Sequence, residues 1–210
     1  MKKENSGIKN ADIAAKRKEE IVSACEKLYK SMSFRDITIK DIAKETTFTR
    51  ASIYNYFETK EEIFLSLYEK EYYIWNDDLE EILSSVKKFT KSSFADKIAK
   101  TLEKRVMLLK LMAMNNYDME ENSRLECLIS FKIAYLKTIN TFSKLLSKFN
   151  PLLSKKEIDD IIYMFYPFIY ALYPYSHVTK KQMMAMEKAG YKWNENTIYK
   201  LTYNFIIKIL

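Results

Sequence analysis

The sequence predicts an all-α protein in two parts, a short N-terminal group of three helices and a larger C-terminal helical part. Three observations favour this fold class. The 210 residues include only 2 glycines and 3 prolines, too few for the turns of a sheet protein. Apolar residues recur every three or four positions along most of the chain. Threonines and serines repeatedly stand three residues before an acidic residue, a pattern typical of helix N-termini.

The first part of the chain predicts three helices, the last two joined by a tight turn. The first helix is expected over residues 11–32, with one apolar face. Thr38, three residues before Asp41, is expected to cap a short second helix, and Thr49 to cap a third. Residues 38–57 therefore predict a helix, a turn and a helix, the arrangement in which the second helix enters the major groove of DNA.

The remainder of the chain predicts longer helices. Their expected starts are marked by capping pairs three residues apart, which are Thr59 with Glu62, Ser93 with Asp96, Ser123 with Glu126, and Ser154 with Glu157. Pro167 is expected to kink the helix that Ser154 opens, and Pro174 to end it. Gly190 lies just past a short helix, and Asn194 is expected to start the last one.

Charge and cysteine content narrow the classes of protein. The net charge is +7, and residues 1–60 carry 13 basic against 9 acidic residues, which suits a phosphate backbone. Cys25 and Cys127 lack metal-ligand spacing and indicate free thiols in a reducing cytoplasm. The longest apolar run, from Ile161 to Tyr175, has 15 residues, too few for a membrane span. We therefore expect a cytoplasmic protein that has no membrane partner.

The run FRDITIKDIAKETTFTRASIYNYFETKEEIF resembles the DNA-binding domain of the tetracycline-repressor (TetR) family of bacterial transcription regulators. The resemblance covers residues 12–65 and is otherwise one of helix pattern and size. It implies a helix-turn-helix DNA-binding domain over residues 1–60, whose first ten or so residues would be flexible. It also implies a helical ligand-binding and dimerisation domain over residues 61–210.

Two positions depart from the family pattern. The turn usually contains glycine, but here it reads Thr46-Thr47-Phe48-Thr49. Thr47 would therefore take a positive φ at some strain cost. Ala51 replaces a frequent glycine at the start of the recognition helix, which is benign because alanine is the better helix former.

The resemblance implies which residues contact DNA. These are Thr38, Lys40, Arg50, Ala51, Ser52, Tyr54, Asn55, Tyr56 and Lys60. Arg50 is the residue expected to read guanine, since its fork matches O6 and N7. Tyr54 and Tyr56 would bind phosphates through their hydroxyls. Lys60 would add charge at the N-terminus of the long helix, where the dipole already favours an anion.

The resemblance also implies a ligand pocket among the middle helices. The Met, Leu and aromatic candidates are Met107, Leu111, Met114, Tyr117, Phe131, Tyr135, Tyr163, Tyr166, Tyr170 and Tyr173. For each of them, ordinary core packing is the alternative. Because the set carries no charge, it favours a small hydrophobic or aromatic effector.

A homodimer joined by the last long helices is the further implication. The expected interface residues are Ile158, Ile162, Phe165, Ile169, Ile198, Leu201, Phe205 and Ile209. Both helices carry apolar residues around more than one face, as expected if one face packs in the monomer and another on a partner. Burial of both helices inside the monomer is the alternative.

The leading interpretation is a ligand-responsive transcriptional regulator, a repressor released from a palindromic operator in double-stranded DNA. The alternative is a helical dimeric binding module without sequence-specific DNA recognition, which only the unusual turn favours. An enzyme has no support, because the sequence lacks a glycine-rich phosphate loop, a nucleophile motif and a metal cluster. His177, the single histidine, lies in a loop without such partners, and no cofactor is expected.

Overall fold

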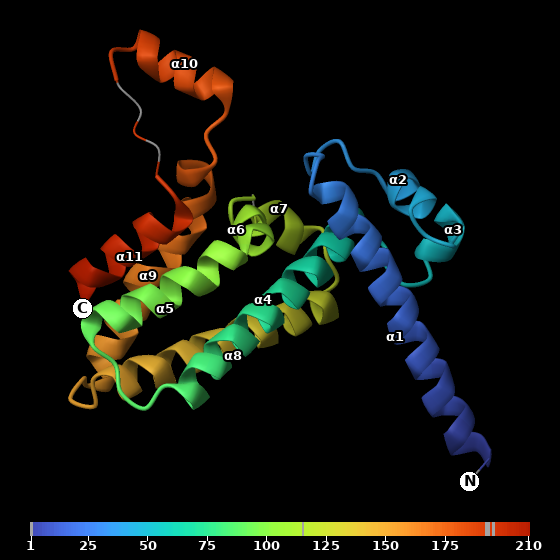
Figure 1. Ribbon diagram of the computed structural model, residues 1–210. Helices are drawn as coiled ribbons and strands as arrows, with labels where there is room; N and C mark the ends of the chain where they lie inside the picture. The colour runs from blue at the N-terminus through green and yellow to red at the C-terminus, as the bar shows by residue number, and fades with distance from the viewer. Residues whose placement is uncertain (1, 115, 192–193, 195) are drawn as a thin grey trace. The chain divides into compact units, whose positions relative to one another are not determined.

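The computed structural model describes residues 2–114, 116–191, 194 and 196–210, with side chains from Asp12 onward except that of Asn116. These residues form helices and connecting loops and no strand (Figure 1). The all-α prediction is therefore confirmed. None of the helices so described is long and apolar enough to cross a membrane.

The chain divides into two compact units. Unit 1 contains Met1–Lys70 and Asn115–Lys132, and unit 2 contains Glu71–Met114 and Ile133–Leu210. The unit around the N-terminal helices is thus larger than the 1–60 domain expected from the sequence. The difference arises because the start of one long helix and a later helical corner pack with it.

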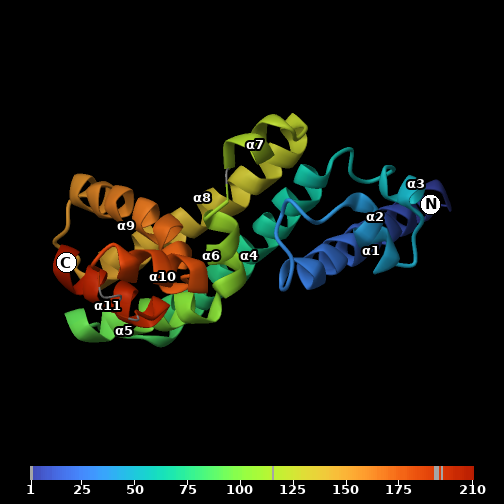
Figure 2. The same cartoon turned by 90° about the horizontal axis from the view of Figure 1, so that it is seen from above.

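Unit 1 is built on three N-terminal helices. Its elements are α1 (Lys2–Tyr29), α2 (Ile39–Lys44), α3 (Arg50–Ile53), the start of α4 (Lys60–Ser85), α7 (Asn116–Glu121) and the start of α8 (Leu125–Phe149). Helix α2 contacts both α1 and α3 (Figures 1 and 2). The ring of Phe64 is buried and lies edge-on to Tyr29 at 5.1 Å and to Phe34 at 4.8 Å. This aromatic cluster fixes α4 against the end of α1.

Unit 2 is a helical bundle. Its elements are the remainder of α4 and α8, with α5 (Lys91–Lys104), α6 (Val106–Met112), α9 (Lys155–Ser176), α10 (Lys180–Lys188) and α11 (Ile198–Ile209). Helix α11 packs against α5 and α9. Phe142 and Phe165 stack in the core with ring centroids 4.5 Å apart. The buried indole of Trp75 donates to the Thr101 hydroxyl at 3.0 Å, so its polar atom is satisfied.

Several predicted helix starts are confirmed. Thr38 with Asp41 caps α2, and Ser154 with Glu157 caps α9, each as a complete capping box. The Thr49 hydroxyl accepts from the N–H of Ser52 at the start of α3. Gly190, which follows α10, has a φ of 84°, the left-handed conformation that favours glycine after a helix.

Other predicted boundaries are wrong. Helix α5 is capped by Thr90, with Ser93 as its partner, so it starts before the expected pair of Ser93 and Asp96. The hydroxyl of Ser123 donates to the Met119 carbonyl at 2.7 Å and caps nothing. Helix α9 continues through Pro174 to Ser176, because a proline in the last turn removes only one hydrogen bond. Helix α11 starts after Thr197, not at Asn194.

Candidate functional site

The turn between α2 and α3 is held by hydrogen bonds. The N–H and the hydroxyl of Thr47 donate to the Glu20 carboxylate of α1 at 2.8 and 2.9 Å. The Thr46 hydroxyl donates to the Ala43 carbonyl at 3.1 Å and accepts from the N–H of Phe48 at 3.2 Å. Among the described residues, no residue other than glycine has a positive φ. The expected strain at Thr47 is therefore absent, and that prediction is wrong.

Helix α3 presents a polar face outward and buries an apolar one. The exposed or half-buried side chains are Arg50, Ala51, Ser52, Tyr54 and Asn55. Ile53 and Phe57 are buried at 0% and 2% exposure. The Arg50 guanidinium donates to the Tyr54 hydroxyl at 3.1 Å and lies 5.7 Å from that ring. This contact uses one of five guanidinium N–H donors, so a fork remains for a base edge.

A cation from α1 joins the predicted phosphate contacts. Arg17, which is exposed, donates to the Tyr56 hydroxyl at 3.0 Å and lies 5.7 Å from the Phe48 ring. An anion at this hydroxyl would meet a guanidinium as well. Arg17 was missed in the sequence, although its position within the basic run KRK was a signal.

Two other predicted DNA contacts already have partners within the protein. The Lys60 ammonium donates to the Phe34 carbonyl at 2.7 Å and lies 4.0 Å from the centre of the Phe34 ring. The Thr38 hydroxyl donates to Asp41 at 2.6 Å as part of the α2 cap. Lys40 is exposed. A phosphate contact by Lys60 would thus compete with its contact to Phe34.

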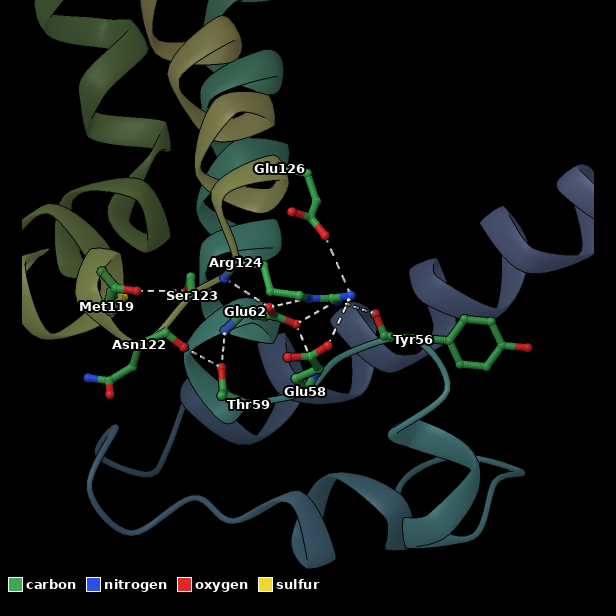
Figure 3. Close-up of polar contacts among 9 residues, drawn as sticks. All are labelled: Tyr56, Glu58, Thr59, Glu62, Met119, Asn122, Ser123, Arg124 and Glu126. Atoms are coloured by element: carbon green, nitrogen blue, oxygen red, sulfur yellow. Dashed lines mark hydrogen bonds and ion pairs between the residues drawn. The ribbon is translucent and has the colours of Figure 1, made fainter.

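An ion pair between a buried carboxylate and a half-buried arginine lies in unit 1, where the loop before α8 contacts the start of α4 (Figure 3). The carboxylate of Glu62 is 0% exposed and accepts from Arg124 through Nε at 2.7 Å, Nη2 at 2.8 Å and the backbone N–H at 3.0 Å. The N–H of Glu58 donates to it at 2.8 Å. Burial raises the pKa of Glu62, but these hydrogen bonds outweigh it and lower the pKa to about 2. No local sequence pattern links the two residues, which are far apart along the chain.

Unit 2 contains a groove between α8 and α9, here named the α8–α9 groove. Its volume is about 890 Å³. It is lined by Tyr135, Leu136, Ile139, Lys155, Asp159, Ile162, Tyr163, Tyr166, Pro167 and Tyr170. The volume lies in the range of small-molecule sites. Four of the predicted pocket tyrosines are among these residues.

The tyrosines bring polar atoms into this apolar groove. The hydroxyls of Tyr72 and Tyr170 are 3.3 Å apart. Burial raises the pKa of Tyr135 to about 12 and that of Tyr166 well above its ordinary value. Among the described residues, the buried Tyr166 hydroxyl has no hydrogen-bond partner. A buried hydroxyl without a partner is costly, which favours a ligand that brings a polar group.

The other predicted pocket residues do not line this groove. They are Met107, Leu111, Met114, Tyr117, Phe131 and Tyr173. Leu111 and Phe131 are buried core residues at 0% and 3% exposure, whereas Tyr117 is 85% exposed. Tyr173 stacks on His177 with ring centroids 4.4 Å apart. For Leu111 and Phe131, core packing accounts for the apolar side chain.

The expected dimer interface needs correction. Five of its eight residues are buried within the chain itself, namely Ile158, Ile162, Phe165, Ile169 and Ile198. Side chains packed in unit 2 cannot also face a partner. The outward side of α9 carries another apolar set, here named the α9 stripe, which consists of Tyr163, Met164, Pro167, Phe168, Ala171 and Tyr175. Three of the expected residues, Leu201, Phe205 and Ile209, are half-buried on α11.

The α9 stripe continues onto α11. Phe168 and Phe205 stack with ring centroids 3.9 Å apart and an interplanar angle of 1°. Tyr163, Met164 and Tyr175 are 78%, 46% and 64% exposed. Large apolar side chains clustered on one helix face are typical of a contact surface.

No metal site is evident in the part of the chain that the structure describes, since no three His, Cys, Asp or Glu residues there could hold an ion. The ring nitrogen Nδ1 of His177 lies 3.0 Å from the Ser176 hydroxyl. The local contacts of this histidine are therefore with its neighbour and with Tyr173.

Two family models match the sequence. Residues 21–67 match the model of bacterial regulatory proteins of the tetR family. Residues 69–195, more than half of the chain, match the model of a tetracyclin repressor-like C-terminal domain. No curated protein matches the sequence.

Solved structures of bacterial regulators share the fold. The fatty acid degradation regulator FadR of Bacillus halodurans aligns with a TM-score of 0.56 and 14% identity, over 92% of this chain and 93% of its own. FadR of Bacillus subtilis in complex with stearoyl-CoA gives 0.55 and 18%, over 91% and 96%. A TetR-family regulator from Mesorhizobium loti gives 0.54 and 14%, over 93% and 95%. With both parts of the sequence matched, this chain belongs to the TetR family of bacterial transcription regulators, which are DNA-binding proteins and not enzymes.

Proposed function

We propose that this DNA-binding regulator is a homodimeric repressor, which binds a palindromic operator and is released by a hydrophobic effector. The observation that carries the proposal is the two-sided helix α3. Arg50, Tyr54 and Asn55 are exposed above the buried Ile53 and Phe57. A short helix anchored in this way can place side chains against base edges while the hydroxyls and cations beside it hold phosphates.

The α9 stripe supports the homodimer. An identical apolar face on a second copy would cover Met164 and Tyr175, which are 46% and 64% exposed in the single chain. A two-fold axis through this contact would present two recognition helices to a two-fold symmetric site. The proposed interface therefore uses the same helices as the sequence indicated, through their outward faces.

The α8–α9 groove supports a hydrophobic effector. Lys155 and Tyr170 line it fifteen positions apart on α9, which corresponds to about 22 Å along the helix. An elongated apolar molecule with a polar end would suit the tyrosine walls and the cation of Lys155. The similarly folded FadR of Bacillus subtilis is known in complex with stearoyl-CoA, so long-chain acyl-CoA compounds are the first to test. The effector must prefer a conformation that binds DNA weakly.

The alternative of a binding module without sequence-specific DNA recognition loses its one supporting observation. It depended on an unusual turn, but Thr46 and Thr47 hold that turn without positive φ.

Three variants in unit 1 test the proposed DNA contacts. Their binding is measured on an operator located by footprinting and on a scrambled duplex. Arg50→Ala should relax sequence choice at one position of each half-site, at about 1–3 kcal/mol. Tyr54→Phe and Lys60→Ala should weaken binding to both duplexes alike. If Lys60 contacts a phosphate, its loss should also reduce the salt slope by about one. Equal effects of all three variants on specificity would contradict the assigned roles.

The effector is tested on the same complex. Stearoyl-CoA should release the operator from the wild-type protein, whereas coenzyme A alone should not. Release by both compounds would point to the polar head group as the ligand. Release by neither would exclude long-chain acyl-CoA while leaving the DNA-binding part of the proposal intact.

A further inference from the structure

We propose that Arg124 is a positioning residue for DNA binding: it fixes the segment that joins the recognition helix to α4, and so makes DNA affinity depend on the position of α8. Arg124 lies far from the helix-turn-helix in the sequence and outside its family match. The inference rests on the proposed function and adds to it a route of regulation.

Arg124 holds the carboxylate of Glu62. This carboxylate has both oxygens bonded to the Arg124 fork, at 2.7 and 2.8 Å, and it is 0% exposed. Removing Arg124 would leave the Glu62 carboxylate buried without its cation, whereas Arg124 itself is 35% exposed and also lies 3.5 Å from Glu58 and 3.7 Å from Glu126. The buried carboxylate of Glu62 thus depends on Arg124 for its charged partner.

The same ion pair is connected to the segment that follows the recognition helix. Arg124 Nη2 donates to the Tyr56 carbonyl at 3.3 Å, and the N–H of Glu58 donates to the Glu62 carboxylate at 2.8 Å. Tyr56 and Glu58 flank Phe57, whose ring is buried at 2% exposure. The N–H groups of Tyr56 and Phe57 in turn donate to the Ile53 carbonyl, at 2.9 and 3.1 Å. The exit of α3 is thus fixed by one side chain from another part of the chain (Figure 3).

A second set of hydrogen bonds holds the same loop. The Thr59 hydroxyl donates to the Asn122 carbonyl at 2.9 Å, and the Ser123 hydroxyl ties the loop to the Met119 carbonyl of α7 at 2.7 Å (Figure 3). The contacts at Thr59 and at Glu62 therefore hold the α7–α8 corner against the start of α4. A single contact would allow the loop to pivot, but two fix its orientation.

Helix α8 is continuous from the residue after Arg124 to the residues that line the α8–α9 groove. The Arg124 carbonyl accepts from the N–H groups of Cys127 and Leu128, at 3.0 and 3.1 Å, so Arg124 is joined to the first turn of this helix. The same helix carries Tyr135 and Leu136, which line the α8–α9 groove. Helix shifts of about 1–2 Å are among the known forms of switching transition, and a shift of α8 would move Arg124 with it. Occupancy of the groove would then change the hold on Tyr56 and Glu58.

The test compares two ion pairs of similar geometry. Arg124→Met removes the fork but keeps an unbranched apolar stem. Arg105→Met is the matched control: Arg105 binds Asp78 through Nε at 2.6 Å and Nη2 at 3.0 Å, and both residues belong to unit 2. Affinity for the footprinted operator is measured by fluorescence anisotropy, at a temperature where both variants are folded and dimeric.

The expected result is a loss of affinity of about 5- to 150-fold for Arg124→Met, the usual range of coupling between sites, and less than twofold for Arg105→Met. Coupling is reciprocal, so operator DNA should slow amide hydrogen exchange in residues 125–139 of the wild-type protein and not of Arg124→Met. A merely structural role would not remove this response.

Arg124→Lys covers the case in which Arg124→Met does not fold. It keeps a charge beside Glu62 but not the fork, so it should fold and bind DNA with intermediate affinity. Wild-type affinity of any folded Arg124 variant, or equal losses in Arg124→Met and Arg105→Met, would overturn the inference. If the wild-type protein bound no DNA at all, the proposed function itself would fail, which is a separate outcome.

Discussion

Acidification should remove a defined part of the stability through Glu62. Its carboxylate is fully buried and accepts hydrogen bonds from Arg124 and Glu58, which lower its pKa from 4.5 to about 2. A carboxylate whose pKa is lower in the folded state stabilises that state above the unfolded pKa. This contribution is lost as the pH falls toward the folded pKa. The window for this group therefore runs from about pH 4.5 down to about pH 2.

The size of the effect follows from the shift. A change from 4.5 to about 2 at roughly 1.4 kcal/mol per pH unit corresponds to about 3 kcal/mol. At pH 7, Glu62→Gln should lose about 3 kcal/mol, the contribution of the ionised carboxylate, because Arg124 remains 35% exposed and near Glu58 and Glu126. At pH 3 the difference between wild type and variant should be smaller by roughly 2 kcal/mol, because the wild-type protein has lost part of this contribution.

Urea unfolding of both proteins between pH 7 and pH 3 measures this difference directly. One protein concentration must be used throughout, since dimerisation adds to apparent stability. Other carboxylates with lowered pKa, such as Glu26 and Asp96, affect both proteins equally and cancel in the difference. A gap that stays constant from pH 7 to pH 3 would refute the ionised, buried pair.

Two further variants test the surfaces of unit 2. Met164→Glu puts a charge into the α9 stripe, so light scattering should show a folded monomer, and operator DNA should bind at least about tenfold more weakly. A dimer of unchanged mass would place the interface elsewhere. Tyr166→Phe removes a buried hydroxyl that has no hydrogen-bond partner among the described residues, so the melting temperature should stay unchanged or rise by the equivalent of about 1 kcal/mol. A clear loss of stability would show that this hydroxyl is hydrogen-bonded in the folded protein.

Much of the DNA-binding head could be predicted because its signals are local. Thr38 with Asp41 and Thr49 with Ser52 are contacts over three residues, and both are present. The buried Ile53 and Phe57 follow from apolar spacing alone. Local spacing could not show that Thr47 donates to the Glu20 carboxylate. This hydrogen bond holds the turn without the positive φ expected at Thr47.

The helices expected to bind the ligand and the partner subunit were less predictable. Helical periodicity identifies apolar faces but not which of two faces is buried, so the interface set included Phe165 and Ile169, which are core residues. Pairs of residues with capping spacing also occur by chance, as at Ser123, whose hydroxyl donates to the Met119 carbonyl. The ion pair of Arg124 and Glu62 joins distant segments, and no periodic pattern encodes such a contact.

Selection of bound sequences from a random DNA duplex pool tests the central claim most directly, with wild type and Arg50→Ala in parallel. The proposed function predicts that the wild-type protein enriches a two-fold symmetric site, and that Arg50→Ala enriches the same site with relaxed choice at one symmetric pair of positions. Salt-sensitive binding to the whole pool without any enriched sequence would contradict a specific regulator.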